Sequence, residues 1–178
     1  MNLGSMMASR YITPFKDDVH AWVTKFSTVS EVLEQWVQVQ GMWMYLEAVF
    51  TSGDIAKQLP QESKRFQGID KNWVKIMSKG NENPNVINYI YGNDVLKQLL
   101  PHMIEQLELC QKALSGYLDQ KRAAFPRFFF LADATLLEVL SQGSNPQAIQ
   151  PHLQSVFDSV VSASARRSKR TLSSPTLR

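Results

Sequence analysis

Apolar residues recur every three or four positions along two long stretches of the chain, and this period is typical of amphipathic helices. One helix is predicted over residues 14–50 and another over residues 94–122. Both stripes are long enough to predict that the two helices pack together as antiparallel partners. Pro101 lacks an amide donor, so we expect a kink or two abutting helices near Leu100. The first stripe contains Val32, Trp36, Val39, Trp43, Leu46 and Phe50, and the second contains Leu96, Leu100, Met103, Leu107, Cys110, Leu114 and Tyr117.

A third long helix is predicted between these two, over residues 60–79, because its apolar residues repeat the same spacing. We also expect a helical turn over residues 55–59 and a short apolar segment over residues 86–91. Aromatic stripes of this kind can line a ligand groove, but packing between helices is their usual role. We therefore assign these residues to the core: Trp36, Trp43, Phe50, Trp73, Leu107 and Leu114.

The stretch 121–146 is predicted to join two helices. Lys121 and Arg122 suit a helix C-terminus, and Pro126 predicts that the helix stops there. The aromatic run that follows is too apolar for a solvated loop, so we expect it to be buried as a rigid joint. Within it Arg127 either orients the turn, by contacting a carboxylate or carbonyls, or remains solvated. The predicted joint consists of Phe125, Pro126, Arg127, Phe128, Phe129, Phe130 and Leu131.

Two more helices are predicted after the joint, over residues 135–142 and 145–159. Thr135 and Glu138 have the spacing of a capping box at the start of the first, and Asp133 is a simpler alternative cap. The chain therefore consists of helical segments almost throughout. The expected fold class is an all-α, elongated helical bundle.

Charge is distributed unevenly along the chain. The last thirteen residues carry five cations and no acid, and the remainder has 14 Lys+Arg against 16 Asp+Glu. The basic character therefore belongs to the C-terminus, which we predict to be a disordered tail. We divide the chain into an N-terminal extension at 1–13, a helical segment at 14–160 and the basic tail at 161–178. Residues 127–131 alone show an alternation that would suit a strand.

Sequence motifs for catalysis, cofactors and metals are absent. Neither glycine-rich phosphate-binding pattern occurs, and His20, His102 and His152 lack the spacing of a metal site. His102 and Glu105 share a helix face, but two ligands are too few for zinc. Cys110 lies on an apolar stripe and is expected to pack rather than react. We expect no enzyme activity, cofactor, metal, small-molecule substrate or membrane span, and the single cysteine agrees with a reducing compartment.

Several motifs in one order resemble the linker region of dynein heavy chains. The motif at 121–131, Lys-Arg-x-x-Phe-Pro-Arg-Phe-Phe-Phe-Leu, is followed at 136–142 by Leu-Leu-Glu-Val-Leu-Ser-Gln. The segment 106–112 is most similar to the axonemal outer-arm heavy chains, and the resemblance covers about residues 3–160. Further matches lie at 58–66, 70–73 and 150–153.

This resemblance implies a mechanical function. In that family the linker arches over a ring of six AAA+ modules and swings as the ring hydrolyses ATP, which moves the motor along a microtubule. The chain would then be a fragment of such a linker arch, without catalysis of its own, in the cytoskeleton of a ciliary or flagellar axoneme. The implied partners are the remainder of a dynein heavy chain, including its AAA+ ring, and the dynein complex subunits.

The residues alone leave two other classes of function open. One is an independent α-helical scaffold with a discrete surface for a partner. The other is a nucleic-acid binder that uses the basic tail, which predicts salt-dependent binding that disappears without residues 163–178. The helical segment itself has no basic footprint that favours nucleic acid. Because the family pattern stops near Val160, we expect a truncated or alternatively spliced piece of linker that is marginally stable alone.

Overall fold

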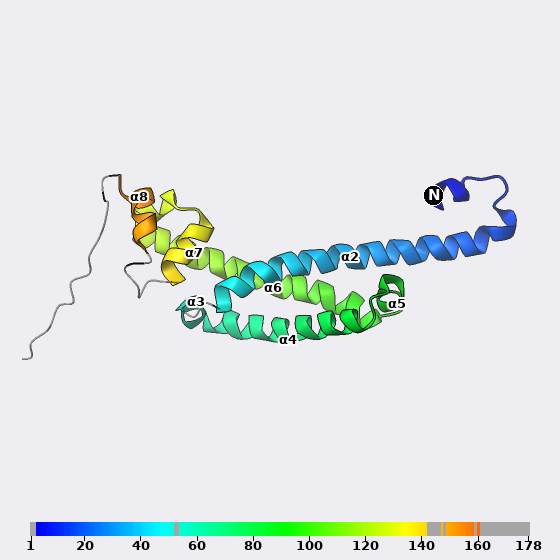
Figure 1. Ribbon diagram of the computed structural model, residues 1–178, viewed down its shortest axis with the longest axis horizontal. Helices are drawn as coiled ribbons and strands as arrows, with labels where there is room; N and C mark the ends of the chain where they lie inside the picture. The colour runs from blue at the N-terminus through cyan, green and yellow to red at the C-terminus, as the bar shows by residue number, and fades with distance from the viewer. Residues whose placement is uncertain (1–2, 52–53, 142–146, 148, 159, 161–178) are drawn as a thin grey trace, which may run out of the picture. The chain divides into compact units, whose positions relative to one another are not determined.

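A computed structural model describes residues 3–51, 54–141, 147, 149–158 and 160 of the chain (Figure 1). Every regular element among these residues is a helix, which confirms the all-α class predicted from the sequence. None of the described helices is long and apolar enough to cross a membrane. The chain divides into two compact units between Tyr117 and Leu118. The basic tail predicted at 161–178 lies outside the described residues.

The first unit is built on one long helix, α2 (Lys16–Thr51), which follows α1 (Leu3–Met7) and the 3₁₀ turn η1 (Thr13–Phe15). Asp17 and Asp18 lie in the first turn of α2, where negative charge is favoured by the helix dipole. The first long helix predicted from the sequence is therefore confirmed.

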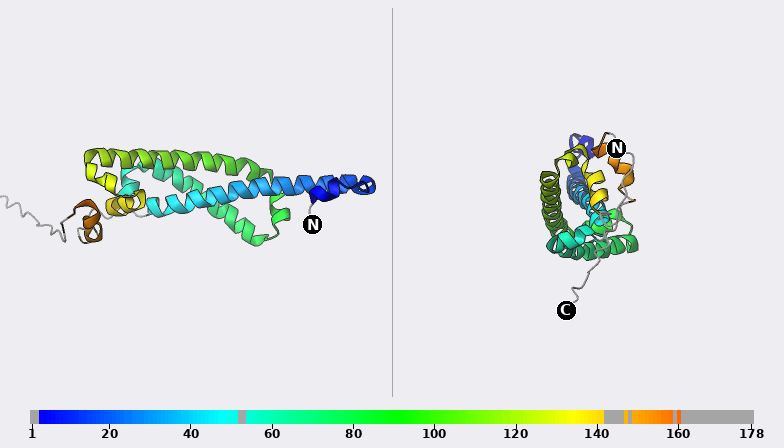
Figure 2. Two further views of the ribbon diagram at one scale, coloured as in Figure 1. Left: turned by 90° about the horizontal axis from the view of Figure 1, so that it is seen from above. Right: turned by 90° about the vertical axis from the view of Figure 1, so that its left-hand side faces the viewer.

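A second long helix, α4 (Pro60–Glu82), returns alongside α2 in the opposite direction (Figures 1 and 2). The short α3 (Asp54–Gln58) lies between them along the chain, and α5 (Val86–Ile90) follows. The Asn85 side chain accepts a hydrogen bond from the Asn88 amide at 3.0 Å and so caps α5. These three helices agree with the predicted helical turn, long helix and short apolar segment.

The third long helix, α6 (Asp94–Ala124), contributes its residues up to Tyr117 to the first unit. In both Figure 1 and Figure 2 this part of α6 runs in the same direction as α2 and opposite to α4. The predicted antiparallel pairing of α6 with α2 is therefore wrong. The reason is topological: α4 lies between the two helices along the chain, and the chain reverses direction both before and after it.

Helix α6 continues through Pro101 without a break. The alternative of two abutting helices is therefore wrong. The Pro101 side chain is exposed, and buried Leu100 and Met103 lie on the packed face on either side of it. Packing of that face keeps the segment helical at the cost of one missing backbone hydrogen bond.

The core of the first unit is apolar and follows the seam between the three long helices. Its largest fully buried side chains come from α2, α3 and α6, and α4 adds an aromatic pair. In this core Phe50 of α2 stacks on Phe66 of α4, with 5.5 Å between ring centroids. The buried residues of the unit include Val39, Leu46, Phe50, Ile55, Phe66, Trp73, Leu100, Met103, Leu107, Cys110 and Leu114.

The second unit begins at Leu118, and its described residues form the end of α6 and four short helices. Helix α6 ends at Ala124, as the proline after it predicts. The short helices are η2 (Pro126–Phe130), α7 (Asp133–Ser141), η3 (Gln150–His152) and α8 (Leu153–Val156), of which η2 and η3 are 3₁₀ helices.

Three local expectations for the second unit are wrong. Residues 127–130 belong to a 3₁₀ helix and Leu131 follows it as the C-cap, so the segment is not a strand. Helix α7 begins at Asp133, so both predicted caps, Asp133 and Thr135, lie within the helix and neither is its N-cap. The last helix, expected over residues 145–159, is shorter, because Pro151 opens a 3₁₀ turn and Phe157 is extended. The start of that predicted helix, at Asn145, lies outside the described residues.

Candidate functional site: the joint after helix α6

The candidate site is the joint formed by residues 125–131, where the chain leaves α6 and enters α7. The Phe125 amide still donates to the Lys121 carbonyl at 3.0 Å, which completes the last turn of α6. The Phe128 amide donates to the Phe125 carbonyl, and the Leu131 amide donates to the Phe128 carbonyl, at 2.9 and 3.1 Å. These bonds span three residues each, so the joint is a tight 3₁₀ turn rather than an open loop.

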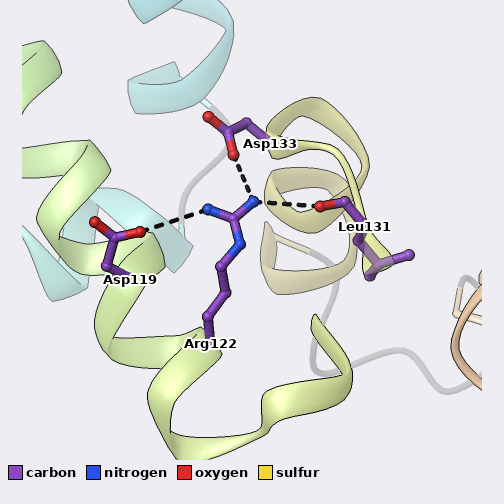
Figure 3. A network of polar contacts seen from close by, with 4 residues as sticks. All are labelled: Asp119, Arg122, Leu131 and Asp133. Atoms are coloured by element: carbon purple, nitrogen blue, oxygen red, sulfur yellow. Dashed lines mark hydrogen bonds and ion pairs between the residues drawn. The ribbon is translucent and has the colours of Figure 1, made fainter. Parts of the chain in front are cut away.

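Arg122, in the last turn of α6, connects that helix to the residue that follows η2 and to the first residue of α7 (Figure 3). Its Nη2 donates to the Leu131 carbonyl at 3.2 Å and to the Asp133 carboxylate. Its Nη1 lies 3.6 Å from Oδ1 of Asp119, one turn earlier in α6. The Arg122 side chain is only 13% exposed, so a cation is held here between two carboxylates and a carbonyl.

The electrostatics of this network keep Arg122 charged. Its hydrogen bond to Asp133 raises the pKa of the guanidinium, and the nearby charge of Asp119 acts in the same direction. The Leu131 carbonyl that it binds follows the last residue of η2, where helix carbonyls lack intrahelical partners. Arg122 therefore acts as a C-terminal cap for η2 as well as an ion-pair partner of α7.

Arg127 plays a similar part at the other end of the unit. Its Nη1 donates to the Val156 carbonyl at 3.1 Å, and its guanidinium carbon lies 5.0 Å from the centroid of the Phe157 ring. Val156 is the last residue of α8, so this arginine also caps the carbonyl end of a short helix. Arg127 thus contacts a carbonyl and is also exposed to solvent, so it combines features of both alternatives.

The aromatic run is only partly buried, which corrects the expected burial. Phe129 and Phe130 are 67% and 73% exposed, whereas Leu131 is buried. A 3₁₀ helix has three residues per turn, so side chains three apart share one face. Phe125, Phe128 and Leu131 have that spacing, and all three are less exposed than Phe129 and Phe130: Phe125 is 37% exposed, Phe128 is half-buried and Leu131 is buried.

The ring contacts follow the same face. The ring centroids of Phe125 and Phe128 are 4.8 Å apart in an edge-to-face arrangement, and the ring of Phe125 lies 6.2 Å from that of Phe157. A further contact joins α7 to η3, where Nε2 of His152 lies 3.5 Å from Oε2 of Glu138. Contacts between side chains therefore connect the joint, α7, η3 and the residue after α8 within the second unit.

Sequence reasoning missed the central residue of this network. The sequence pattern indicates Arg122 only as a cation that suits a helix C-terminus, and Asp133 only as a possible cap. The two are separated by eleven positions, so no helical spacing indicates that they pair. The available signal was the combination of a basic helix end with an acid just beyond a short, proline-initiated turn.

All six residues that the sequence assigns to the core lie in the first unit, whereas the joint belongs to the second. Phe50, Trp73, Leu107 and Leu114 are buried, while Trp36 and Trp43 are half-buried at the edge of the seam. The ring centroid of Trp36 lies 5.4 Å from that of Trp73. Trp43 Nε1 donates to the Asp70 carboxylate at 3.0 Å, so its polar group is satisfied by α4.

The titratable groups of the first unit suit a structural role. Burial raises the pKa of the Cys110 thiol, whose Sγ donates to the Glu62 carbonyl at 3.8 Å. A protonated, buried thiol is a poor nucleophile. Burial likewise raises the pKa of Tyr89, which donates to the Ile76 carbonyl at 3.0 Å. Among the described residues, no three potential metal-ligating side chains come together.

Comparison with known proteins gives a consistent result. The family described as "Dynein heavy chain, N-terminal region 2" matches residues 1–174, so the expectation that the family pattern stops near Val160 is wrong. The chain is 58% identical over 160 residues to dynein axonemal heavy chain 8 of Homo sapiens and 53% identical over 160 residues to dynein axonemal heavy chain 5 of Mus musculus, each match covering 90% of this chain. It is 54% identical over 172 residues, 96% of its length, to the "Dynein gamma chain, flagellar outer arm" of Chlamydomonas reinhardtii. The chain spans about 4% of the length of each of these relatives.

Proposed function

This chain belongs to the dynein heavy chain family, and we propose that it forms part of the mechanical linker of an axonemal heavy chain. In this role it transmits motion between an AAA+ ring and the rest of the motor, and so couples ATP hydrolysis to movement along a microtubule. The segment contributes stiffness and shape rather than catalysis. Its proposed partners are the remainder of the heavy chain and the other dynein subunits, in the axoneme of a cilium or flagellum.

The observation that supports this proposal is the Arg122 network. A lever must carry force past the point where a helix ends, and α6 ends at Ala124. Beyond that point an unbraced chain would bend. Arg122 lies on the α6 side of the break, and its hydrogen bonds reach Leu131 and Asp133 on the far side.

The proposed source of stiffness therefore differs from simple burial of the aromatic run. Phe129 and Phe130 are exposed, and removing them leaves the inward face of the joint intact. Hydrogen bonds of a charged donor depend steeply on distance and angle, so they resist bending as well as separation. Arg127 adds a second such contact, from the joint to the end of α8.

The test is an Arg122→Gln substitution in a full-length axonemal heavy chain, with gliding velocity and ATPase rate measured on the same preparation. We expect microtubule gliding to slow while the ATPase rate stays at the wild-type value, because turnover and displacement become uncoupled. Glutamine keeps a polar side chain but loses the charge and the planar group of donors that reach Leu131, Asp133 and Asp119 together.

The matched control is Lys112→Gln, which removes the same charge from an exposed position on the same helix. The control should glide at the wild-type velocity. Unchanged gliding in the Arg122→Gln motor would contradict the proposal that this joint transmits force. Loss of gliding and ATPase activity together would indicate a general defect of the motor and would also contradict it.

A further inference from the structure

Four lysines form a row along the outer face of α4. Lys64, Lys71, Lys75 and Lys79 follow one another at spacings of seven, four and four residues, so they share one side of the helix. All four are exposed. The opposite side of α4 is the buried one, and Figure 1 shows α4 along an edge of the first unit. The residues of that buried side are Ser63, Phe66, Ile69, Trp73 and Ile76.

The charges of the lysine row have no ion-pair partner among the residues that the structure describes, as is also true of Lys16 and Lys112 in the same unit. Lys57 and Lys97 each pair with an aspartate three residues earlier, at 2.9 and 3.1 Å. None of the four lysines of the row has an acid three residues earlier, and none forms an ion pair with any residue that the structure describes, although Glu82 follows Lys79 by three residues at the end of α4. Asp70 lies on the side of α4 away from the row, and its carboxylate accepts a hydrogen bond from Trp43 rather than from a lysine of the row.

Within the row the lysines repel one another. Lys71 and Lys75 are four residues apart, as are Lys75 and Lys79, and like charges at this spacing destabilise a helix. Lys75 thus has a cation on both sides. An anionic partner along this face would offset the repulsion, whereas solvent and salt only screen it.

The surface beside the row is hollowed. A recess of about 310 Å³ lies between α4 and the start of α6, with Lys75 and Lys79 on its border. Asn72 and Asn93 also line it, together with Ile76, Leu96 and Leu99. The recess can take one side chain of a partner that is held by the lysines, and its amides can donate to a carboxylate.

We propose that the lysine row of α4 is a docking face for an acidic protein segment, such as a helix or peptide with carboxylates every three or four residues. That spacing would place one carboxylate opposite each lysine. The inference uses charge and geometry within the first unit, and it does not depend on the linker proposal.

An acidic protein segment fits this face better than a nucleic acid does. Single strands bind where bases stack on exposed aromatic rings, and both aromatic residues of α4, Phe66 and Trp73, are buried. Outside α4, residues 1–117 carry six Lys+Arg and nine Asp+Glu, so the surroundings repel a long polyanion. A short acidic segment avoids most of that repulsion because it stays on the row.

The test measures binding of a fluorophore-labelled deca-glutamate peptide to the full chain by fluorescence anisotropy, at low and at physiological ionic strength. The test variant is the triple substitution Lys71→Gln, Lys75→Gln and Lys79→Gln. The matched control neutralises three other exposed lysines of the first unit, Lys16, Lys57 and Lys112. Both variants keep the basic C-terminus and have the same net charge, so any difference between them reports on the row.

We expect the row variant to bind the peptide about tenfold more weakly than the control variant, as the loss of three exposed ion pairs predicts. Circular dichroism should show unchanged helix content, because the substitutions remove repulsion and no buried contact. Equal binding by the two variants would overturn the proposal. Tighter binding of an oligothymidylate than of the peptide, lost in the row variant alone, would also overturn it in favour of a nucleic-acid surface.

Discussion

The two units of this chain differ in the contacts that stabilise each of them internally. The first unit has three helices longer than twenty residues, and each buries a continuous apolar stripe, so that Leu46, Leu100 and Leu107 are fully enclosed. Among its described residues, the second unit has helices of nine residues or fewer after α6 ends, and these bury fewer apolar side chains, among them Leu131 and Leu136. There the arginines Arg122 and Arg127 bind carbonyls at the ends of short helices.

The difference shows what helix length demands of a sequence. A long helix leaves few backbone groups unsatisfied relative to its buried surface, so apolar periodicity is enough to stabilise it. A short helix has almost as many free ends as internal bonds, so its stability depends on side chains that reach those ends. We therefore expect substitutions to have graded effects that separate the two units.

The largest effect is expected from Leu107→Ala in the seam of the first unit. Leu107 is fully buried, and truncating such a leucine removes its apolar contacts and leaves a cavity, at a cost of about 2–5 kcal/mol of unfolding free energy. The measurement is urea unfolding followed by circular dichroism. Leu109→Ala is the matched control on the same helix, because Leu109 is 43% exposed, and it should change the unfolding free energy by less than about 0.5 kcal/mol. Similar losses at both positions would show that the seam is not the main source of stability.

An intermediate effect is expected from the polar contact of the first unit. Trp43→Phe keeps most of the aromatic surface and removes the hydrogen bond from the indole to Asp70, which should cost about 1 kcal/mol. A double-mutant cycle with Asp70→Ala isolates the interaction. A coupling energy near zero would mean that the carboxylate is equally well satisfied by water, and that the first unit relies on apolar packing alone.

The smallest effect is expected in the second unit, at the exposed aromatic pair. Phe129→Ala and Phe130→Ala should each change the unfolding free energy by no more than about 0.5 kcal/mol, because both side chains are largely in solvent. Leu131→Ala, next along the chain, removes a buried side chain and serves as the positive control. Hydrogen exchange of the α7 amides is the readout. Faster exchange in the phenylalanine variants would show that these rings stabilise the joint after all.

Sequence reasoning predicted the features that depend on neighbouring residues. The three long helices, the end of α6 before Pro126 and the short helices α3 and α5 all follow from periodicity and from the missing amide of proline. The direction of α6 relative to α2 could not be obtained in this way, because an apolar stripe packs equally well against a parallel or an antiparallel neighbour. The family resemblance depended on residue identity and did not require the geometry.

The joint shows where local reasoning fails. The aromatic run was expected to be buried because each of its residues is apolar, but burial depends on which face the turn presents. A 3₁₀ turn selects every third residue, and this places Phe128 and Leu131 inward and leaves Phe129 and Phe130 outside. The pairing of Arg122 with Asp133 is a tertiary contact made possible by that turn. The sequence contains both residues, but the distance between them is set only after the turn has formed.

The placement of the tryptophans gives the chain a built-in optical reporter. The sequence has four, Trp22, Trp36, Trp43 and Trp73, and all four precede Tyr117, so they belong to the first unit. Intrinsic tryptophan emission therefore reports on the surroundings of that unit, and the second unit, with phenylalanine as its aromatic residue, is silent in the same spectrum. Circular dichroism records helices of both. Recording the two signals during one denaturant titration separates the melting of the short, arginine-capped helices from that of the long seam, without any label.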